Sequence, residues 1–405
     1  MVQMEINFSE PMEEKQMAYG EITCKRLLLL VGSNPLPNYI TALILKPQSI
    51  FLFYSPETEQ VMKYLCKALE VALSGAHLDA TCIEDATSAA KVRSAFPTNL
   101  HDFHFHYTGG TKIMAAHARM AFRDAGGKDE QASYLDERKG VLRFDNGYGL
   151  HLAKQQLGLT LDDVLGLHGI NPHSRRQLQA DDPWEDDAAR IARAVLEDSS
   201  LAQSLYHLHW DRQTNKPLPF IKAKANAVKV DELVPGGLSI QRIPEEHWKA
   251  KTYDNWLRFL GGGWLEAWCG ALVRQIVDGD EIAVGLDCKL ANGRQCEVDV
   301  ALVRGHRFYV ISCTTDSNIG LCKSKLFEAA MRARQLGGDL ARSALVCLLH
   351  GSDLKGAFVD QLRNDVADVW DAPNTPQVFG LDDLKEWAGI GSPPALNSLR
   401  TWLES

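Results

Sequence analysis

The sequence has no long uninterrupted apolar run. Its apolar stretches are short and strand-like, as in residues 27–31, and none approaches the roughly 18 uncharged residues that a membrane helix needs. A membrane span is therefore excluded. The first residues, MVQMEINFSEPMEEKQ, carry acidic side chains and no apolar signal-peptide core. From this pattern we expect a cytoplasmic protein.

Cysteine spacing is equally uninformative for metal binding. The chain has nine cysteines but no CxxC pair and no Cys/His grouping at zinc-ligand spacing. We therefore expect buried thiols in a reducing compartment and no structural zinc site.

Excess positive charge is also missing. The 43 Lys and Arg residues are outnumbered by 52 Asp and Glu residues, which gives a formal net charge of −9. The molecule as a whole does not attract nucleic acid, so any contact with phosphates must come from a local basic patch.

A chain of 405 residues is too long for one ordinary core. Its pattern predicts three parts. Residues 1–157 alternate strand and helix signals, as in a doubly wound, Rossmann-like α/β sheet. Residues 158–245 are helical and strongly charged, which we interpret as a connector. Residues 246–405 predict a mixed α/β domain in which NG and RG turns punctuate the strands.

In the first part, RLLLLVGS, SIFLFYS, LDATCIED, HDFHFHYTGG and ASYLDERKGVLRF read as strands, and 57–73 and 111–125 read as amphipathic helices. Ligands of doubly wound sheets bind beyond the carboxyl ends of the strands. The loops after Val31, Ile83 and Tyr107 are therefore the places where a site is expected.

The segment HYTGGTKIMAAHA puts two glycines and two threonines between a strand and a helix. Gly109 and Gly110 allow the backbone to approach a ligand closely. The amides of Thr111 and Lys112 lie at a helix N-terminus, where a phosphate is favoured. An isolated TGGT is equally compatible with a threonine-capped helix start.

TGGTKIM after such a strand, with the polar loop VGSNPLPNYIT after the first strand, resembles the CRISPR-associated Rossmann-fold (CARF) sensor domains. These domains bind cyclic oligoadenylates across a dimer axis. The resemblance covers roughly the first 150 residues and implies a ligand site whose phosphate and ribose contacts come from Thr108, Gly109, Gly110, Thr111 and Lys112. Ser33 and Asn34 would lie on the opposite side of the nucleotide, and Glu84 and Asp85 are weaker candidates.

In the third part, Glu297 and Asp299 alternate with valines in a strand, so both carboxylates project from one face. Two carboxylates on one face favour a divalent cation such as Mg²⁺ or Mn²⁺. The same alternation also fits the wetted face of an edge strand. Glu266, on a preceding helix, could add a third carboxylate or form an ion pair with Arg258 or Arg274.

The order of these elements resembles the PD-(D/E)XK nuclease superfamily. GGWLE, ExD and the later LGG are similar to the restriction-endonuclease-like half of sensor-linked nucleases. The resemblance implies Asp299, Glu297, Glu266 and Glu328 as metal ligands. One departure stands out: where that family has Glu-Cys-Lys at the end of the third strand, this chain has Ser312, Cys313 and Thr314.

Two explanations of the departure are open. The catalytic residues are lost, leaving a binding module, or they are relocated to the following helix. There, Lys325 and Glu328 are i and i+3 neighbours that could restore a lysine and a carboxylate. We favour relocation, although such a pair is also typical of an ordinary exposed helix surface.

The resemblance implies a homodimer that binds a cyclic oligoadenylate, with cyclic tetra-adenylate matching the symmetry of two sensor domains. It implies a metal-dependent endonuclease that cleaves DNA or RNA in type III CRISPR antiviral defence. The alternatives are a nuclease-dead receptor and a ring nuclease that degrades the activator. A DNA-binding regulator ranks last, because residues 158–245 show no basic recognition helix.

Overall fold

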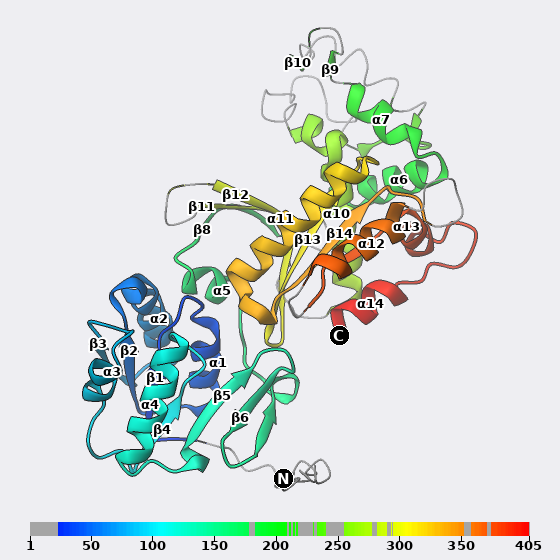
Figure 1. Cartoon of the computed structure of the whole chain (residues 1–405). Helices are drawn as coiled ribbons and strands as arrows, with labels where there is room; N and C mark the ends of the chain where they lie inside the picture. The colour runs from blue at the N-terminus through cyan, green and yellow to red at the C-terminus, as the bar shows by residue number, and fades with distance from the viewer. Residues whose placement is uncertain are drawn as a thin grey trace, which may run out of the picture. The chain divides into compact units, whose positions relative to one another are not determined.

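The computed structural model describes residues 23–177, 183–208, 210–211, 214, 216–217, 230, 233–239, 255–277, 282–289, 293, 295–351, 358–370 and 374–404. The chain divides into two compact units, Met1–Gly158 and Leu159–Ser405 (Figure 1). Within the described ranges, no helix is long and apolar enough to cross a membrane.

A seven-stranded sheet in the order β3-β2-β1-β4-β5-β6-β7 forms the first unit. Its strands are β1 (Arg26–Leu30), β2 (Ser49–Tyr54), β3 (His77–Cys82), β4 (Phe103–His106), β5 (Ala132–Asp136), β6 (Val141–Phe144) and β7 (Gly149–His151). The strands from β3 to β5 are parallel, and β6 and β7 run antiparallel. The chain leaves β1 toward β2 and β3 and returns to its other side at β4, so the topological switch point lies between β1 and β4.

Alternating side chains of this sheet build two cores. Leu28 and Leu30 pack with α3 and α4, while Leu27 and Leu29 face the side of α1 and α2. All four leucines are fully buried. The helices are α1 (Leu36–Leu45), α2 (Glu59–Ala72), α3 (Ala89–Ala95) and α4 (Lys112–Asp124).

The doubly wound fold is confirmed, but two local predictions were incomplete. The segment 132–144, predicted as one strand, is a hairpin, in which Gly140 adopts φ 61° in the turn between β5 and β6. The loop after β1 is shorter than predicted, because α1 begins at Leu36 with a proline in its first turn.

A six-stranded sheet in the order β15-β14-β13-β12-β11-β8 organises the second unit. Its strands are β8 (Asn171–Gln177), β11 (Ile282–Lys289), β12 (Gln295–Arg304), β13 (Arg307–Thr314), β14 (Arg342–Cys347) and β15 (Gln377–Phe379). The chain from β8 to β13 is antiparallel, and β14 and β15 add parallel strands. This mixed α/β class agrees with the sequence prediction.

Residues 158–245, interpreted as a helical connector, also supply a strand of this sheet. They contain the helices α5 (Leu161–Leu167), α6 (Pro183–Glu197) and α7 (Ser200–His207) and a short hairpin of β9 (Trp210–Asp211) and β10 (Lys216–Pro217). Strand β8 pairs with the otherwise unpaired edge of β11, and α6 packs against α10. This region therefore contains strands in addition to the predicted helices.

Helices cover both faces of the second sheet. On one face, α6, α7, α10 (Trp264–Ile276), α13 (Leu381–Ala388) and α14 (Asn397–Glu404) share one apolar cluster with β11 to β14. On the other, α11 (Ile319–Gly337) and α12 (Phe358–Val369) enclose a second cluster with β14 and β15.

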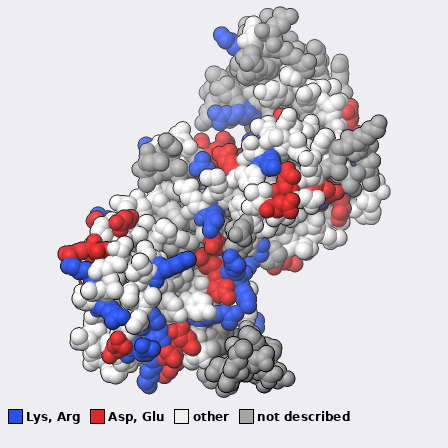
Figure 2. Space-filling view, viewed as in Figure 1, with Lys and Arg blue, Asp and Glu red and all other residues white. Residues whose placement is uncertain are grey.

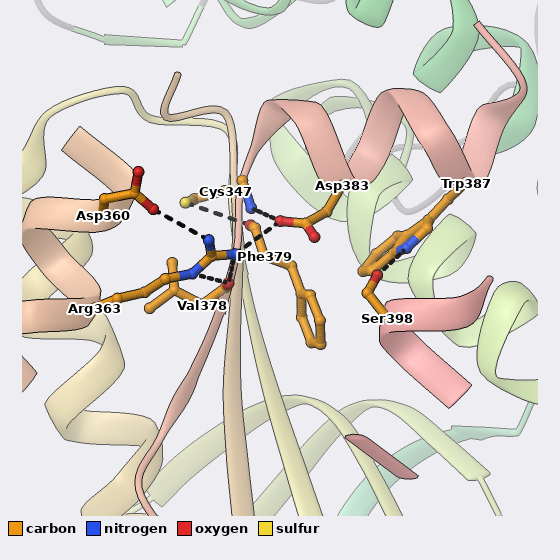
Figure 3. A network of polar contacts seen from close by, with 9 residues as sticks. Cys347, Asp360, Arg363, Val378, Phe379, Asp383, Trp387 and Ser398 are labelled. Carbon is orange, nitrogen blue, oxygen red and sulfur yellow. Dashed lines mark hydrogen bonds and ion pairs between the residues drawn. The ribbon is translucent and has the colours of Figure 1, made fainter. Parts of the chain in front are cut away.

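Polar contacts fasten the C-terminal elements to the sheet (Figure 3). The guanidinium of Arg363 on α12 donates to the Val378 carbonyl at 2.7 Å and forms ion pairs with Asp360 and Asp383. The indole nitrogen of Trp387 donates to Ser398 Oγ at 2.9 Å. These bonds link α12, β15, α13 and α14.

Mild acid should destabilise the first unit. Burial lowers the pKa of His104 to about 4 and that of His106 to about 3, from 6.5. Below about pH 6.5, the two imidazoles are therefore protonated in the unfolded chain but remain neutral in the folded unit. The folded unit carries no penalty from these histidines above pH 6.5. Its free energy of unfolding falls as the pH drops from 6.5 toward the lowered pKa values.

We expect the circular-dichroism Tm to fall between pH 7.5 and 5, and to fall less in a His104→Gln/His106→Gln double variant. Equal slopes for the two proteins would contradict the assignment.

Candidate functional sites

The loops after β1 and β4 meet backbone to backbone at the switch point. A Cβ atom on Gly109 would lie 1.9 Å from the Leu30 carbonyl oxygen, and one on Gly32 would lie 2.9 Å from the Gly110 amide nitrogen. Gly110 also adopts φ 79°, in the left-handed region. Glycine is therefore required on both sides of this contact.

Both threonines of the TGGT loop use their side-chain oxygens to accept backbone amides. Thr111 Oγ1 accepts from the Met114 amide at 3.1 Å and caps α4, and Thr108 Oγ1 accepts from the Leu135 amide at 2.6 Å. Each hydroxyl still carries a proton to donate. The capping interpretation is thus correct, and it leaves both side chains able to bind a ligand that only accepts, as phosphate oxygens do.

Ser33 and Asn34 lie directly beside this loop, because Gly32 contacts Gly109 and Gly110. The Ser33 side chain is exposed, as are Thr111 and Lys112. Asn34 Oδ1 accepts from the amide of Leu36, the first residue of α1, at 3.1 Å. Two helix N-termini, those of α1 and α4, thus begin at the switch point, which favours an anion there.

Glu84 and Asp85 lie elsewhere, after the edge strand β3. Glu84 forms an exposed ion pair with Lys91 at 2.8 Å, and Asp85 accepts from Thr87. The order of the strands puts β2 and β1 between β3 and β4. The loop after Ile83 is therefore outside the switch point.

Sequence reasoning missed a polar network that holds the base of the TGGT loop. Asp145, beyond β6, accepts from the Tyr107 hydroxyl and from Arg119 Nε, each at 2.6 Å. Burial and the neighbouring Asp145 raise the pKa of Tyr107, so its hydroxyl stays a donor. Only the spatial approach of Asp145 to α4 reveals this network.

Positive charge is not concentrated on the visible face of the first unit. Figure 2 shows Lys and Arg interspersed with Asp and Glu on the visible face of the first unit. The chain as a whole also has no excess of positive charge, since its formal net charge is −9. Within the TGGTK loop itself, the basic side chain is Lys112, which is exposed.

In the second unit, Asp299 of β12 and Ser312 of β13 lie side by side. Asp299 Oδ2 accepts from Ser312 Oγ at 3.0 Å and from the Cys313 amide at 2.6 Å. The neighbouring Val300 and Ile311 form a pair in the β12–β13 register and face the α10 side. Asp299 and Ser312 therefore project toward α11.

Helix α11 brings Lys325 and Glu328 into the electrostatic neighbourhood of Asp299. Burial raises the pKa of Asp299, and the Cys313 amide, the charge of Lys325 and the Ser312 hydroxyl oppose that rise. The charge of Glu328 raises the pKa further. Glu328 also forms an ion pair with Arg332 at 3.7 Å. An ion pair one turn along the helix is what an ordinary exposed helix surface would also show.

Glu297 shares this side of the strand with Asp299. Burial, Asp299 and Asp287 raise the pKa of Glu297, while Arg258 and Lys325 lower it. Asp287 stands directly opposite Glu297 in the β11–β12 register. Sequence reasoning missed Asp287, although its position in the strand EIAVGLDCKL gave a signal.

Other predicted residues are arranged differently. Glu266 lies in the first turn of α10, on the other side of the sheet. Its charge contributes to the raised pKa of the Cys313 thiol, for which the hydrogen bond with Cys269 is the largest cause. Arg274 pairs with Glu185 of α6. Lys323 pairs with Asp365 of α12 at 2.8 Å. The two lysines therefore differ in their surroundings: Lys323 pairs with Asp365, whereas Lys325 influences Asp299.

The departure from Glu-Cys-Lys has a structural counterpart. Ser312 supports Asp299 through a hydrogen bond and brings no charge. Thr314 is buried, and its Oγ1 accepts from the Asp316 amide at 3.3 Å. Neither residue supplies the charge of a carboxylate or an ammonium group.

The donor set fits a weakly held magnesium-type cation better than a closed metal cage. Among the described residues, no group of three or more His, Cys, Asp and Glu side chains is close enough to hold a metal ion. Mg²⁺ commonly keeps several waters and takes only one or two carboxylates. Asp299, oriented by two hydrogen bonds, is the carboxylate best prepared for that role.

No protein-family profile and no curated protein sequence matches the chain. Solved structures do. Can2 from Sulfobacillus thermosulfidooxidans, in complex with cyclic tetra-adenylate, aligns with a TM-score of 0.65 at 17% identity, covering 94% of this chain and 100% of Can2. Protein VC1899 from Vibrio cholerae aligns with a TM-score of 0.64 at 16% identity, over 94% and 98% of the two chains.

A type III CRISPR defence DNA nuclease activated by cyclic oligoadenylate aligns with a TM-score of 0.56 at 16% identity, over 96% of this chain and 54% of that one. The chain shares the fold of these three proteins. The fold implied by the sequence resemblance is therefore confirmed.

Gly109→Ala should destabilise the first unit alone by about 1–3 kcal/mol, because the added methyl group meets a backbone carbonyl that cannot rotate away. All nine tryptophans lie beyond residue 158. Tryptophan fluorescence therefore reports on the second unit and serves as an internal control. We expect the circular-dichroism unfolding curve to shift while the fluorescence curve does not; unchanged curves by both methods would contradict the close contact.

Proposed function

We propose that this chain is a cyclic-oligoadenylate-activated, metal-dependent nuclease of type III CRISPR antiviral defence. The observation that carries the proposal is that the likeness to Can2 bound to cyclic tetra-adenylate extends over 94% of the chain and so includes both units. A nuclease activated by cyclic oligoadenylate has the same fold over 96% of this chain.

In the proposed sensor, the ligand phosphates bind at the two helix N-termini of the switch point. Thr108 and Thr111 donate their hydroxyl protons, Gly109 and Gly110 let the backbone approach, and Lys112 adds a positive charge. Ser33 and Asn34 contact the nucleotide from the β1 side. A homodimer would present two such loops to cyclic tetra-adenylate, whose halves are related by the same two-fold symmetry.

In the proposed nuclease, the substrate is DNA or RNA and the cation is Mg²⁺ or Mn²⁺. Asp299 would hold the cation together with Glu297 or Glu328, whereas Glu266 on α10 lies on the other side of the sheet and is left out of the proposed set. When bound, the cation would polarise the scissile phosphate and supply a hydroxide nucleophile. Lys325 would stabilise the charge that develops on the phosphate oxygens. The influence of Lys325 on Asp299 supports relocation of the missing lysine to α11.

A receptor without nuclease activity is the second candidate. Ser312 and Thr314, which lack the charges of the Glu-Cys-Lys pattern, favour it. In that case, ligand binding would be retained and no nucleic acid would be cut.

Ligand-dependent cleavage is the decisive test. Labelled single- and double-stranded DNA and RNA are incubated with Mn²⁺ or Mg²⁺, with and without cyclic tetra-adenylate. We expect cutting only when ligand and metal are both present. Tight ligand binding without cutting on any substrate would instead establish the receptor.

Asp299→Asn should lower cleavage about a hundredfold or more, because it removes the central charge. The amide keeps an acceptor for the Cys313 backbone, and burial already disfavours the ionised carboxylate, so folding stability should be equal or higher. Ligand affinity should not change.

Lys325→Ala should lose activity to a similar degree, whereas Lys323→Ala, which affects only the pair with Asp365, should cleave normally. Normal cleavage by Lys325→Ala would overturn relocation.

A further inference from the structure

Helix α1 docks onto the strands of the switch point through polar side chains. Asn38 and Thr41, at i and i+3 on α1, are both completely buried. Asn38 Nδ2 donates to the Leu30 carbonyl of β1 at 2.7 Å, and Thr41 contacts His106 of β4. An apolar face would fix this helix less specifically, since apolar contacts have no direction.

His106 links three elements. Its Nε2 lies 3.2 Å from Thr41 Oγ1 on α1, and its Nδ1 lies 3.2 Å from Ser133 Oγ on β5. Ser133 Oγ also lies 2.8 Å from Nε2 of His104. All four side chains are buried, so each needs its partners within the protein.

Chemistry assigns a direction to these bonds. The Thr41 hydroxyl donates to the Pro37 carbonyl at 2.8 Å, so it must accept from His106 Nε2–H. Nδ1 of the neutral ring is then an acceptor and receives the Ser133 hydroxyl proton. Ser133 in turn accepts from His104. The bonds form one ordered chain from β4 through β5 and back through β4 to the first turn of α1.

This chain of bonds reaches both ligand loops. Pro37 lies in the first turn of α1, directly after the Ser33–Asn34 loop. The Ser133 carbonyl accepts from the Tyr107 amide at 3.0 Å, one residue before Thr108. A shift of α1 relative to β4 would therefore break a buried hydrogen bond.

We propose that His106 is a positioning residue for the cyclic-oligoadenylate site: through Thr41 and Ser133 it holds the Ser33–Asn34 loop in register with the TGGTK loop. This inference rests on the proposed ligand-binding function. It concerns a residue that is fully buried and touches no ligand.

The experiment compares affinity for cyclic tetra-adenylate with Tm in the full chain. His106→Leu and Thr41→Val each remove the link between α1 and β4. We expect each to weaken binding about tenfold, and the double variant to weaken it no further, because both break the same contact. His106→Gln, which can still hydrogen-bond, should recover most of the affinity.

Leu69→Ala on α2 is the matched control, because it lowers the Tm by leaving a cavity in the core without touching the chain of bonds. It should leave the affinity unchanged below its Tm. Wild-type affinity in His106→Leu, or an equal loss in Leu69→Ala, overturns the positioning role. If the wild-type protein binds no cyclic oligoadenylate, the proposed function fails, and this inference fails with it.

Hydrogen exchange provides a readout that needs no ligand. The amides of Ser33, Asn34 and Leu36 should exchange faster in His106→Leu, although the substitution is on another strand. Unchanged exchange in that loop would also contradict the proposal.

Discussion

Contact between two loop backbones governs the first unit. The loop after β1 and the loop after β4 approach so closely that Gly109 has no room for a Cβ atom beside the Leu30 carbonyl. Because the loops touch, the N-termini of α1 and α4 begin at one place. The sheet order supplies the location, the glycines permit the approach, and the helix termini make the place favourable for an anion.

A comparable constraint acts in the second unit, where the alternation of strand side chains separates two functions. Side chains on one side of β12 and β13 build the apolar cluster with α10, so Asp299 and Ser312 must face α11. A charged residue required near Asp299 can therefore come from that helix. This geometry puts Lys325 of α11 within electrostatic reach of Asp299, as the proposed relocation requires.

Many of the elements and candidate site residues were predictable from local sequence patterns. Strands of β-branched and leucine residues, the TGGTK loop and the carboxylates at Glu297 and Asp299 follow from periodicity and short motifs. What escaped prediction depends on partners distant in sequence. Strand β8 forms because β11 has a free edge. Asp287 matters because it lies opposite Glu297 on the adjacent strand. The contact between Thr41 and His106 joins residues 65 positions apart.

Strand β8 has a mechanical consequence. It is the first strand after the boundary at Gly158, so a pull on the backbone at that boundary passes through α5 into β8. Its pairing with β11 is irregular on both sides of Asp287, where the register shifts. A register shift of this kind interrupts the ladder of hydrogen bonds locally. A force on the chain at that boundary would be borne by the β8–β11 pairing, whose irregular part lies beside Asp287 and its partner Glu297.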